Sequence, residues 1–158
     1  MMNTSIIGIS GSQSLCVKAL VYVASAERLP IYASGESVKE ELNKRQMEFA
    51  DFDSLFQRET QDPMHFFDSL YNCVLVCSSD SDWYNARRTV TKRNRIFTWL
   101  TVQMRRRDVI FLYDIPEGFK VDKRIARGTS CRVDVKELKS GALSIKVQNR
   151  YNKGGIKI

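Results

Sequence analysis

Short apolar runs separated by polar or helical segments form the main pattern along the chain. Four runs have the length and continuous apolar character of buried strands: Ser5–Ser10, Pro30–Ala33, Cys73–Cys77 and Val109–Tyr113. The first run is followed by apolar residues at helical spacing: Leu15, Ala19, Leu20 and Val23. A helix of about a dozen residues between two strands suits a right-handed parallel crossover. The pattern therefore predicts an α/β domain with a mostly parallel sheet and a central first strand.

The remaining segments predict helices, a loop region and a hairpin. We expect Glu36–Asp62 to form a surface loop with a short helix, and Ile96–Met104 to form a helix closed by three arginines. Cys131–Leu138 and Ala142–Asn149 alternate between apolar and polar residues, and Ser140-Gly141 between them favours a hairpin. A chain of 158 residues favours one domain. We expect its main unit over residues 1–135, continued by residues 136–158.

Positive charge is concentrated in the second half of the chain, within a net charge of +7. Residues 1–79 carry six Lys/Arg and ten Asp/Glu, whereas residues 80–158 carry nineteen and eight. The cations come in clusters: Arg87-Arg88, Lys92-Arg93-Arg95, Arg105-Arg106-Arg107 and Lys120/Lys123/Arg124/Arg127. This clustering favours a nucleic-acid partner over a solvated basic face without a partner.

Other classes of protein find little support in the sequence. No apolar run approaches the roughly 18 residues of a membrane span, and no secretion signal is visible, so we expect a soluble, unsecreted protein. The four cysteines, Cys16, Cys73, Cys77 and Cys131, lack paired C-x-x-C spacing and lie far from His65 in sequence. Buried thiols are therefore expected rather than metal ligands, and no metal site is predicted.

The first strand-to-helix segment lies where α/β folds bind phosphate groups. A phosphate-binding loop has the form G-x-x-x-x-G-K-[ST], because glycine lets backbone amides approach the phosphates, lysine neutralises them and the hydroxyl holds magnesium. Placing Ser14 at the hydroxyl position puts Gln13 at the lysine position, so only the final serine matches. An ordinary Gly/Ser turn is the alternative explanation. The candidate nucleotide-site residues, in vestigial form, are Gly8, Gly11, Ser12, Gln13 and Ser14.

Later phrases resemble, in order and spacing, the P-loop DNA-translocating ATPases of the virus-packaging and zonula-occludens-toxin-like group. The phrases are Asp51-Phe52-Asp53-Ser54-Leu55, Trp83 with Arg87-Arg88, Arg105-Arg106-Arg107-Asp108, and Val121-Asp122-Lys123-Arg124-Ile125. The resemblance covers roughly Ile6 to Val135. It implies a P-loop-like three-layer sandwich with a mostly parallel sheet and a C-terminal β-hairpin.

The same resemblance implies a nucleotide site that has lost its chemistry. The Walker B acids of such ATPases correspond to Ser78 and Ser79 here, and Pro116 appears near the position of their polar sensor. Magnesium needs hard oxygen ligands, which those carboxylates would supply. Asp80 and Asp82 lie just beyond, either as displaced metal ligands or as loop carboxylates capping the following segment.

The sequence therefore favours a catalytically degenerate P-loop ATPase-like protein of viral or mobile-element origin. We expect a nucleic-acid-binding or assembly component near genome packaging or morphogenesis, in the host cytoplasm or virion. An active ATPase with an atypical site and a plain protein-interaction domain remain the alternatives. No resident cofactor is expected, magnesium-ATP should bind weakly, and the partners should be nucleic acid, a second copy or an active ATPase. Residues expected at the nucleic-acid or subunit contact are Arg87, Arg88, Lys92, Arg93, Arg105, Arg106, Arg107, Lys123, Arg124 and Arg127.

Overall fold

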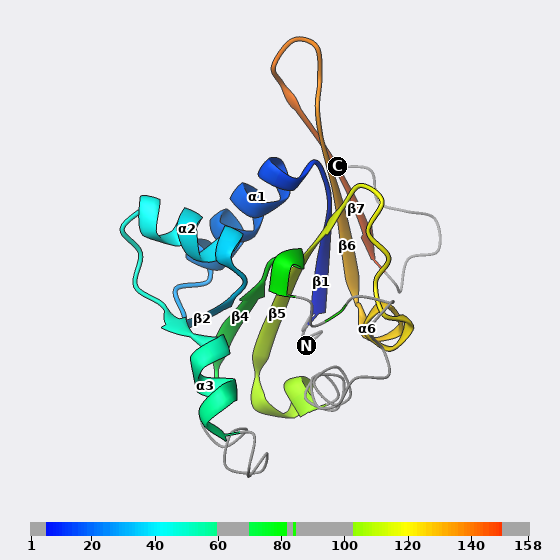
Figure 1. Ribbon diagram of the computed structural model, residues 1–158. Helices are drawn as coiled ribbons and strands as arrows, with labels where there is room; N and C mark the ends of the chain where they lie inside the picture. Colours follow the sequence, from blue (N-terminus) through cyan, green and yellow to red (C-terminus); the bar gives the residue numbers. More distant parts are fainter. Residues whose placement is uncertain (1–5, 60–69, 82–83, 85–102, 150–158) are drawn as a thin grey trace.

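A seven-stranded sheet runs through the part of the chain that the computed structural model describes, residues 6–59, 70–81, 84 and 103–149 (Figure 1). The strands lie in the order β3-β2-β4-β5-β1-β6-β7. All neighbouring pairs are parallel except β6 and β7. The strands are β1 (Ile6–Gly11), β2 (Ile31–Ser34), β3 (Ala50–Asp51), β4 (Cys73–Cys77), β5 (Val109–Pro116), β6 (Cys131–Glu137) and β7 (Leu143–Asn149).

The four apolar runs of the sequence are confirmed as parallel strands of one sheet. The prediction that the first strand is central is wrong by one position, because β5 is the middle strand and β1 lies beside it. The reason is visible in the side chains. All eight residues of β5 are buried or half-buried, whereas β1 ends in the less buried Ser10 and Gly11. The middle position is thus held by a strand that is covered on both faces.

Helices cover both faces of the sheet and give the expected three layers (Figure 1). On one face, α1 (Gln13–Ala26) and α2 (Glu36–Lys44) bury Leu20, Val38 and Leu42 against the strands. On the other face, α3 (Phe52–Glu59) and α6 (Lys123–Gly128) contribute Phe52 and Ile125 to a second apolar cluster. Short 3-10 turns, η1 (Ser79–Ser81) and η3 (Met104–Arg107), follow β4 and precede β5.

The segment expected to be a surface loop with one short helix contains more structure than predicted. It forms α2, the two-residue strand β3 and α3. In α2 only Val38 and Leu42 are buried, one turn apart, which gives the sequence a weak helical signal. The helix expected over Ile96–Met104 lies largely outside the described residues, and its described end is the 3-10 turn η3.

The C-terminal hairpin is confirmed. Its two strands pair in antiparallel register from Cys131 opposite Asn149 to Glu137 opposite Leu143. At its base, β6 also pairs in parallel with β1, from Ile7 beside Cys131 to Ser10 beside Asp134. Residue 135 lies within β6, so the hairpin continues the main sheet without a break.

One glycine fixes the place where β1 turns into α1. A Cβ atom on Gly11 would overlap the carbonyl oxygen of Val135, and the φ angle of Gly11 is +151°. We therefore expect Gly11→Ala to lower the free energy of unfolding by about 3 kcal/mol, since both a clash and an unfavourable backbone angle arise. Urea denaturation followed by circular dichroism would measure the change.

Gly118→Ala is the matched control for this prediction. Gly118 has a φ angle of +81°, but a Cβ atom there would meet nothing within 4 Å. Its substitution should lower the free energy of unfolding only through the unfavourable backbone angle, by about 1 kcal/mol. Equal losses in the two variants would contradict the close approach of β6 to Gly11.

Candidate functional site

The carboxyl ends of the parallel strands meet at one edge of the sheet, where α/β folds bind their ligands. Gly11 lies beside Pro116 of β5, and Cys77 at the end of β4 lies beside Tyr113. The candidate nucleotide-site residues and the candidate Walker B residues therefore belong to this carboxyl edge. Its three local features are the β1–α1 junction, the end of β4, and the buried carboxylate of β5.

The β1–α1 junction consists of one residue. Gly8 and Gly11 belong to β1, Ser12 is the N-cap of α1, and Gln13 and Ser14 are exposed in its first turn. The N-cap side chain makes no hydrogen bond to the helix. A phosphate cradle needs a loop of several residues whose amides point inward. The extended backbone through Gly11 leaves a single residue between strand and helix for that purpose.

At the end of β4, the candidate Walker B residue Ser78 is buried and serves the start of α2. Its backbone N–H donates to the carbonyl of Ser34 at 3.0 Å, and its hydroxyl accepts from the N–H of Val38 at 3.4 Å. The same hydroxyl donates to Asp80. Ser79 is half-buried in η1. These contacts connect β4 to the helix after β2.

Asp80 caps the amino end of α2. Its Oδ2 accepts from the backbone N–H of Ser37 at 2.9 Å and from the Ser37 hydroxyl at 3.0 Å. Gly35 precedes this helix with a φ angle of +98°, and a Cβ atom there would overlap the Ser78 hydroxyl. Of the two roles considered for Asp80, capping is observed, although it caps the earlier helix α2 rather than the following segment. Asp82 lies outside the described residues.

The main feature that sequence reasoning missed is Asp114 in β5. Its side chain is fully buried, and its Oδ1 accepts a hydrogen bond from the Tyr84 hydroxyl at 2.6 Å. Its Oδ2 is also buried and has no hydrogen-bond partner of good geometry among the described residues. Burial raises the pKa of Asp114 to about 6, against the hydrogen bond from Tyr84 and the backbone amide of Ser79, which lower it. The only signal in the sequence is a single carboxylate within an apolar run.

Tyr84 joins this carboxylate to the chain that follows β5. Its ring makes edge-on contacts with Tyr113 and Phe119, with centroids 5.0 Å and 5.4 Å apart. Its carbonyl oxygen accepts from the N–H of Asp122 at 2.7 Å, and Asp122 is the N-cap of α6. Burial raises the pKa of Tyr84 well above its ordinary value, and Asp114 adds to that effect. A neutral tyrosine and a buried carboxyl group therefore fill the carboxyl edge between β4 and β5.

The segment Asp51–Leu55 has a structural role. Lys39 Nζ lies 2.8 Å from Asp51 and 2.7 Å from Asp53, which joins α2 to the start of α3. Asp53 also accepts from the Ser34 hydroxyl at 2.6 Å and from the Gly35 amide at 3.2 Å. Burial raises the pKa of Asp53, but its hydrogen bonds with Lys39, Ser34 and Gly35 outweigh that effect and lower it. Against the effect of burial, the pKa of Asp51 is likewise lowered by Lys39, so the two aspartates stay ionised and hold the two helices together.

The structure separates the candidate contact cations that it describes. Arg87, Arg88, Lys92 and Arg93, and the side chain of Arg105, lie outside the described part. Arg106 is exposed before β5, and the guanidinium of Arg107 lies 4.7 Å from the Tyr71 ring centroid. Lys123, Arg124 and Arg127 belong to α6, where Arg124 donates to the buried Asp122 at 2.9 Å. Two clusters therefore occupy different places, one at the amino end of β5 and one on α6.

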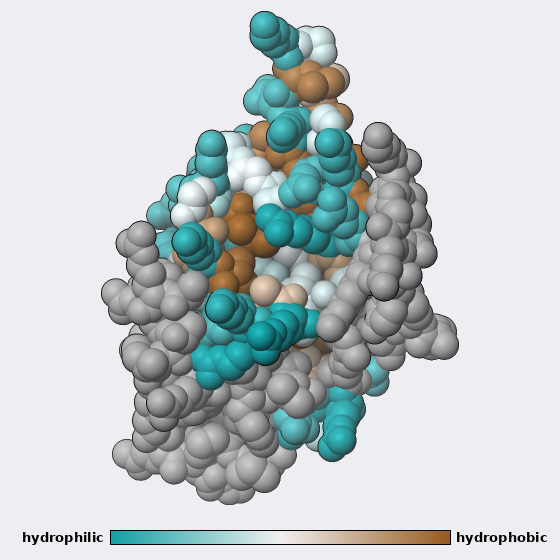
Figure 2. All heavy atoms as spheres, turned by 90° about the vertical axis from the view of Figure 1, so that its right-hand side faces the viewer, coloured by the Kyte–Doolittle hydropathy of each residue, from teal (hydrophilic) through white to brown (hydrophobic). Residues whose placement is uncertain are grey.

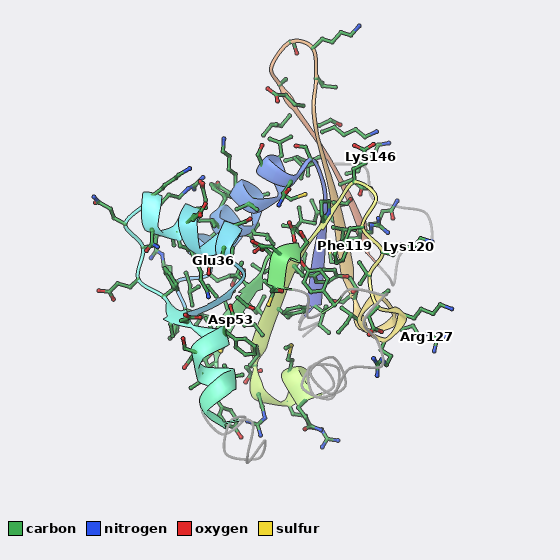
Figure 3. The ribbon with its side chains drawn as sticks, viewed as in Figure 1. Glu36, Asp53, Phe119, Lys120, Arg127 and Lys146 are labelled. Atoms are coloured by element: carbon green, nitrogen blue, oxygen red, sulfur yellow. The ribbon has the colours of Figure 1, made fainter. Side chains whose placement is uncertain are left out.

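Two further cations, Lys136 and Lys146, were missed as candidates. Lys136 belongs to β6 and Lys146 to β7. Lys146 lies on the side of the molecule that also carries Lys120 and Arg127 (Figure 3). Figure 2 views this side, where hydrophilic residues surround the base of the hairpin. The alternation of the hairpin strands is the sequence signal that would have placed both lysines on one face.

A depression of about 740 Å³ lies between the carboxyl end of β1, the segment after β5 and the hairpin. Its charged lining residues are balanced, three cations against three carboxylates: Arg132, Lys136, Lys146, Glu117, Asp134 and Glu137. Ser10 at the end of β1 donates to Asp134. The lining thus offers no excess positive charge for a triphosphate. Within the described residues, no group of three or more His, Cys, Asp or Glu side chains could hold a metal ion.

Comparison with protein-family models gives no match, and comparison with curated protein sequences gives none. Among solved structures, the chain is similar to the N-terminal domain of zonular occludens toxin from Neisseria meningitidis. The TM-score is 0.57 at 11% identity, over 92% of this chain and 84% of that one. It is also similar to the genome packaging NTPase B204 from Sulfolobus turreted icosahedral virus 2, with a TM-score of 0.55 at 10% identity, over 88% and 78%.

A third similar structure is EssC (ATPases 2 and 3) from Geobacillus thermodenitrificans, with a TM-score of 0.50 at 13% identity, over 83% of this chain and 32% of that one. At these identities the likeness concerns the fold. Together with the mostly parallel sheet, it shows that this chain has a P-loop NTPase-like fold. No helix among the described residues is long and apolar enough to cross a membrane.

The raised pKa of Asp114 predicts a pH dependence of stability. Its value rises from 3.8 to about 6 in the folded chain, so between these values the folded state binds more protons than the unfolded state. The free energy of unfolding should then fall as the pH rises through this window. Asp114→Asn keeps the acceptor for Tyr84 but cannot ionise. The free energy of unfolding of Asp114→Asn, relative to that of the wild type, should therefore increase by about 2–3 kcal/mol as the pH rises from 4 to 7.

Urea denaturation at several pH values would measure this difference. Asp108→Asn is the control, because Asp108 is exposed and lies at the other end of β5. A difference between Asp114→Asn and the wild type that stays constant with pH would contradict the buried ionisable carboxyl group.

Proposed function

We propose that this chain is a P-loop NTPase-like domain that has lost nucleotide hydrolysis and works as a nucleic-acid-binding or assembly component. Its origin would be a virus or mobile element, and its place would be near genome packaging or morphogenesis, in the host cytoplasm or virion. The similar B204 protein is described as a genome packaging NTPase, which supports this setting. A domain without turnover of its own would act through a partner, either a second copy or an active ATPase.

The carboxyl edge of the sheet supports the proposed loss of nucleotide hydrolysis. Hydrolysis needs a lysine against the triphosphate and carboxylates that hold magnesium and orient water. Here Gln13 stands at the lysine position, and Ser78 is occupied with the start of α2. The nearby buried carboxyl group, Asp114, is hydrogen-bonded to a buried tyrosine. A triphosphate placed there would meet an uncompensated negative group once Asp114 ionises.

Charge in the segments after β5 supports the proposed binding of nucleic acid. Residues 117–148 carry eight Lys/Arg and four Asp/Glu. Of these carboxylates, Asp122 is buried against Arg124, and Asp134 lies 3.9 Å from Arg132. Lys120, Lys123 and Arg127 are exposed. Clustered exposed cations attract a polyanion, because each neutralised phosphate releases counterions.

The two alternatives differ from this proposal in measurable ways. An active ATPase with an atypical site would use Ser14, Lys18 and Asp80 or Asp82. Lys18 is exposed further along α1, Asp80 caps α2, and Asp82 lies outside the described residues. A plain protein-interaction domain would keep the fold and the basic surface without affinity for nucleic acid. Turnover separates the first alternative from the proposal, and nucleic-acid affinity separates the second.

We expect magnesium-ATP to be hydrolysed at the background rate. Gln13→Lys alone should not restore turnover, since the metal would still lack its carboxylates at Ser78 and Ser79. Release of inorganic phosphate at increasing protein concentration is the measurement. A rate that rises with protein concentration and disappears in Ser14→Ala would overturn the loss of hydrolysis.

We expect sequence-tolerant binding to duplex DNA that weakens steeply with salt. The logarithm of the affinity should fall with the logarithm of salt concentration, with a slope near −0.9 for each phosphate contact. Lys120→Ala combined with Lys123→Ala should flatten that slope by about two units if both lysines contact phosphate. Fluorescence anisotropy with a labelled duplex would measure the slope.

Lys18→Ala combined with Lys44→Ala is the matched control, because it removes two exposed lysines from α1 and α2. This control should keep the wild-type slope. Absence of binding by the wild type at low salt would remove nucleic acid from the proposal.

A further inference from the structure

The outer part of the hairpin extends beyond the rest of the sheet (Figure 1). The pairing of β1 with β6 ends at Ser10 beside Asp134. Beyond that point β6 and β7 pair only with each other among the described residues, from Val135 opposite Ile145 to Glu137 opposite Leu143. Val135 is still buried in the core and β6 ends at Glu137, so the projecting part is the outer end of the hairpin, residues 136–144. The hairpin is therefore a two-stranded ribbon that projects from the body of the protein.

The two faces of this ribbon differ in chemistry. One face carries polar side chains from both strands: Arg132, Asp134, Lys136, Ser144, Lys146 and Gln148. Its only carboxylate, Asp134, accepts from Ser10 and lies 3.9 Å from Arg132, so this face carries three cations against one carboxylate. Lys136 lies opposite Ser144, and Lys146 lies opposite Asp134, so the two lysines are diagonal neighbours on this face. The polar face is therefore positively charged.

The polar face adjoins the other exposed cations of this side. The segment after β5 lines the same depression as Arg132 and Lys146 through Pro116, Glu117, Gly118 and Phe119, and Lys120 follows these residues. Figure 3 shows Lys120, Lys146 and Arg127 extending from the segment after β5, the hairpin and α6 on one side of the molecule. Cations of the ribbon and of the body thus lie on the same side of the molecule.

Large apolar side chains near the end of the ribbon remain in water. Leu138, Leu143 and Ile145 are 50%, 54% and 46% exposed. Figure 2 shows hydrophobic residues along the hairpin, with hydrophilic ones at its tip. Such exposure at a projecting element is characteristic of a contact surface.

We propose that the β6–β7 hairpin inserts into the major groove of duplex DNA, with Lys136 and Lys146 on the phosphate backbone beside the groove. This inference rests on the nucleic-acid binding proposed above and names its docking element. The major groove of DNA is about 12 Å wide and 8.5 Å deep and admits a two-stranded ribbon. Ser144 can bond to base edges, and Leu143 and Ile145 can contact thymine methyl groups.

Duplex DNA fits this ribbon better than a lipid surface or a second copy of the ribbon. Glu137 lies opposite Leu143 on the apolar face, so insertion of that face into lipid would bury a carboxylate. Edge-to-edge pairing of two ribbons would bring together two sets of lysines, Lys136, Lys139 and Lys146, which repel each other. Duplex DNA offers phosphates to the lysines and a groove to the exposed apolar residues.

The first experiment removes the two ribbon lysines. Lys136→Ala combined with Lys146→Ala should weaken duplex binding and flatten its salt dependence by about two units. Lys18→Ala combined with Lys44→Ala, which removes the same charge elsewhere, should leave both quantities unchanged. Circular dichroism would verify that each variant keeps its fold.

The second experiment blocks the groove while keeping the phosphates. A duplex with bulky glucosyl groups on the C5 position of its pyrimidines should bind the wild type at least about tenfold more weakly than the unmodified duplex. A duplex RNA of the same sequence should also bind more weakly, because its major groove is deep and narrow. A purely phosphate-directed surface would be insensitive to the C5 groups.

The outcomes separate the two proposals. Failure of the wild type to bind any duplex at low salt would overturn both nucleic-acid binding and hairpin docking. If neither the lysine substitutions nor the C5 groups change the affinity for duplex DNA, nucleic-acid binding stands and hairpin docking is overturned. Lysine-dependent binding to phosphatidylserine vesicles, with no effect of the C5 groups on DNA binding, would overturn hairpin docking in favour of a lipid surface.

Discussion

The hydrogen bond between Tyr84 and Asp114 organises the functional edge of this fold. It places a buried carboxyl group between β4 and β5, and it holds the tyrosine that positions the segment after β5. Through the Tyr84 carbonyl and the Asp122 amide, the same residue fixes the start of α6, which leads directly into β6. The carboxyl edge and the base of the hairpin are therefore linked through one residue, by the side chain of Tyr84 on one side and its backbone carbonyl on the other. A change at Asp114 would be felt in both places, because buried polar groups depend strongly on their partners.

Polar residues at this edge act mainly on the fold. Ser78 and Asp80 satisfy the amino end of α2, whose first amides would otherwise lack partners. Asp51 and Asp53 share Lys39 and so connect the helices on opposite faces of the sheet. In an active nucleotide site such groups would have to stay available for metal and phosphate. The observed arrangement gives them local structural partners, which agrees with the proposal that hydrolysis has been lost.

The sequence was sufficient for the parallel strands and the hairpin, because each has a strong pattern of its own. The continuous apolar run of β5 and the alternation of β6 and β7 need no tertiary information to be recognised. The short junction at Gly11 could not be predicted, since it depends on the close approach of Val135 from a strand far along the chain. The role of Asp114 was hidden for the same reason: its partner Tyr84 lies thirty positions away. Helix α2 was missed because charged residues outnumber its two buried ones.

Charge is distributed unevenly across the sheet. Glu36, at the start of α2, and Lys146, on the hairpin, lie on opposite sides of the molecule (Figure 3). Residues 36–53 carry six carboxylates and three Lys/Arg, whereas residues 117–148 carry the opposite excess. These two described segments therefore separate negative from positive charge across the strands of the sheet. In the field of a polyanion this separation would favour approach with residues 117–148 in front.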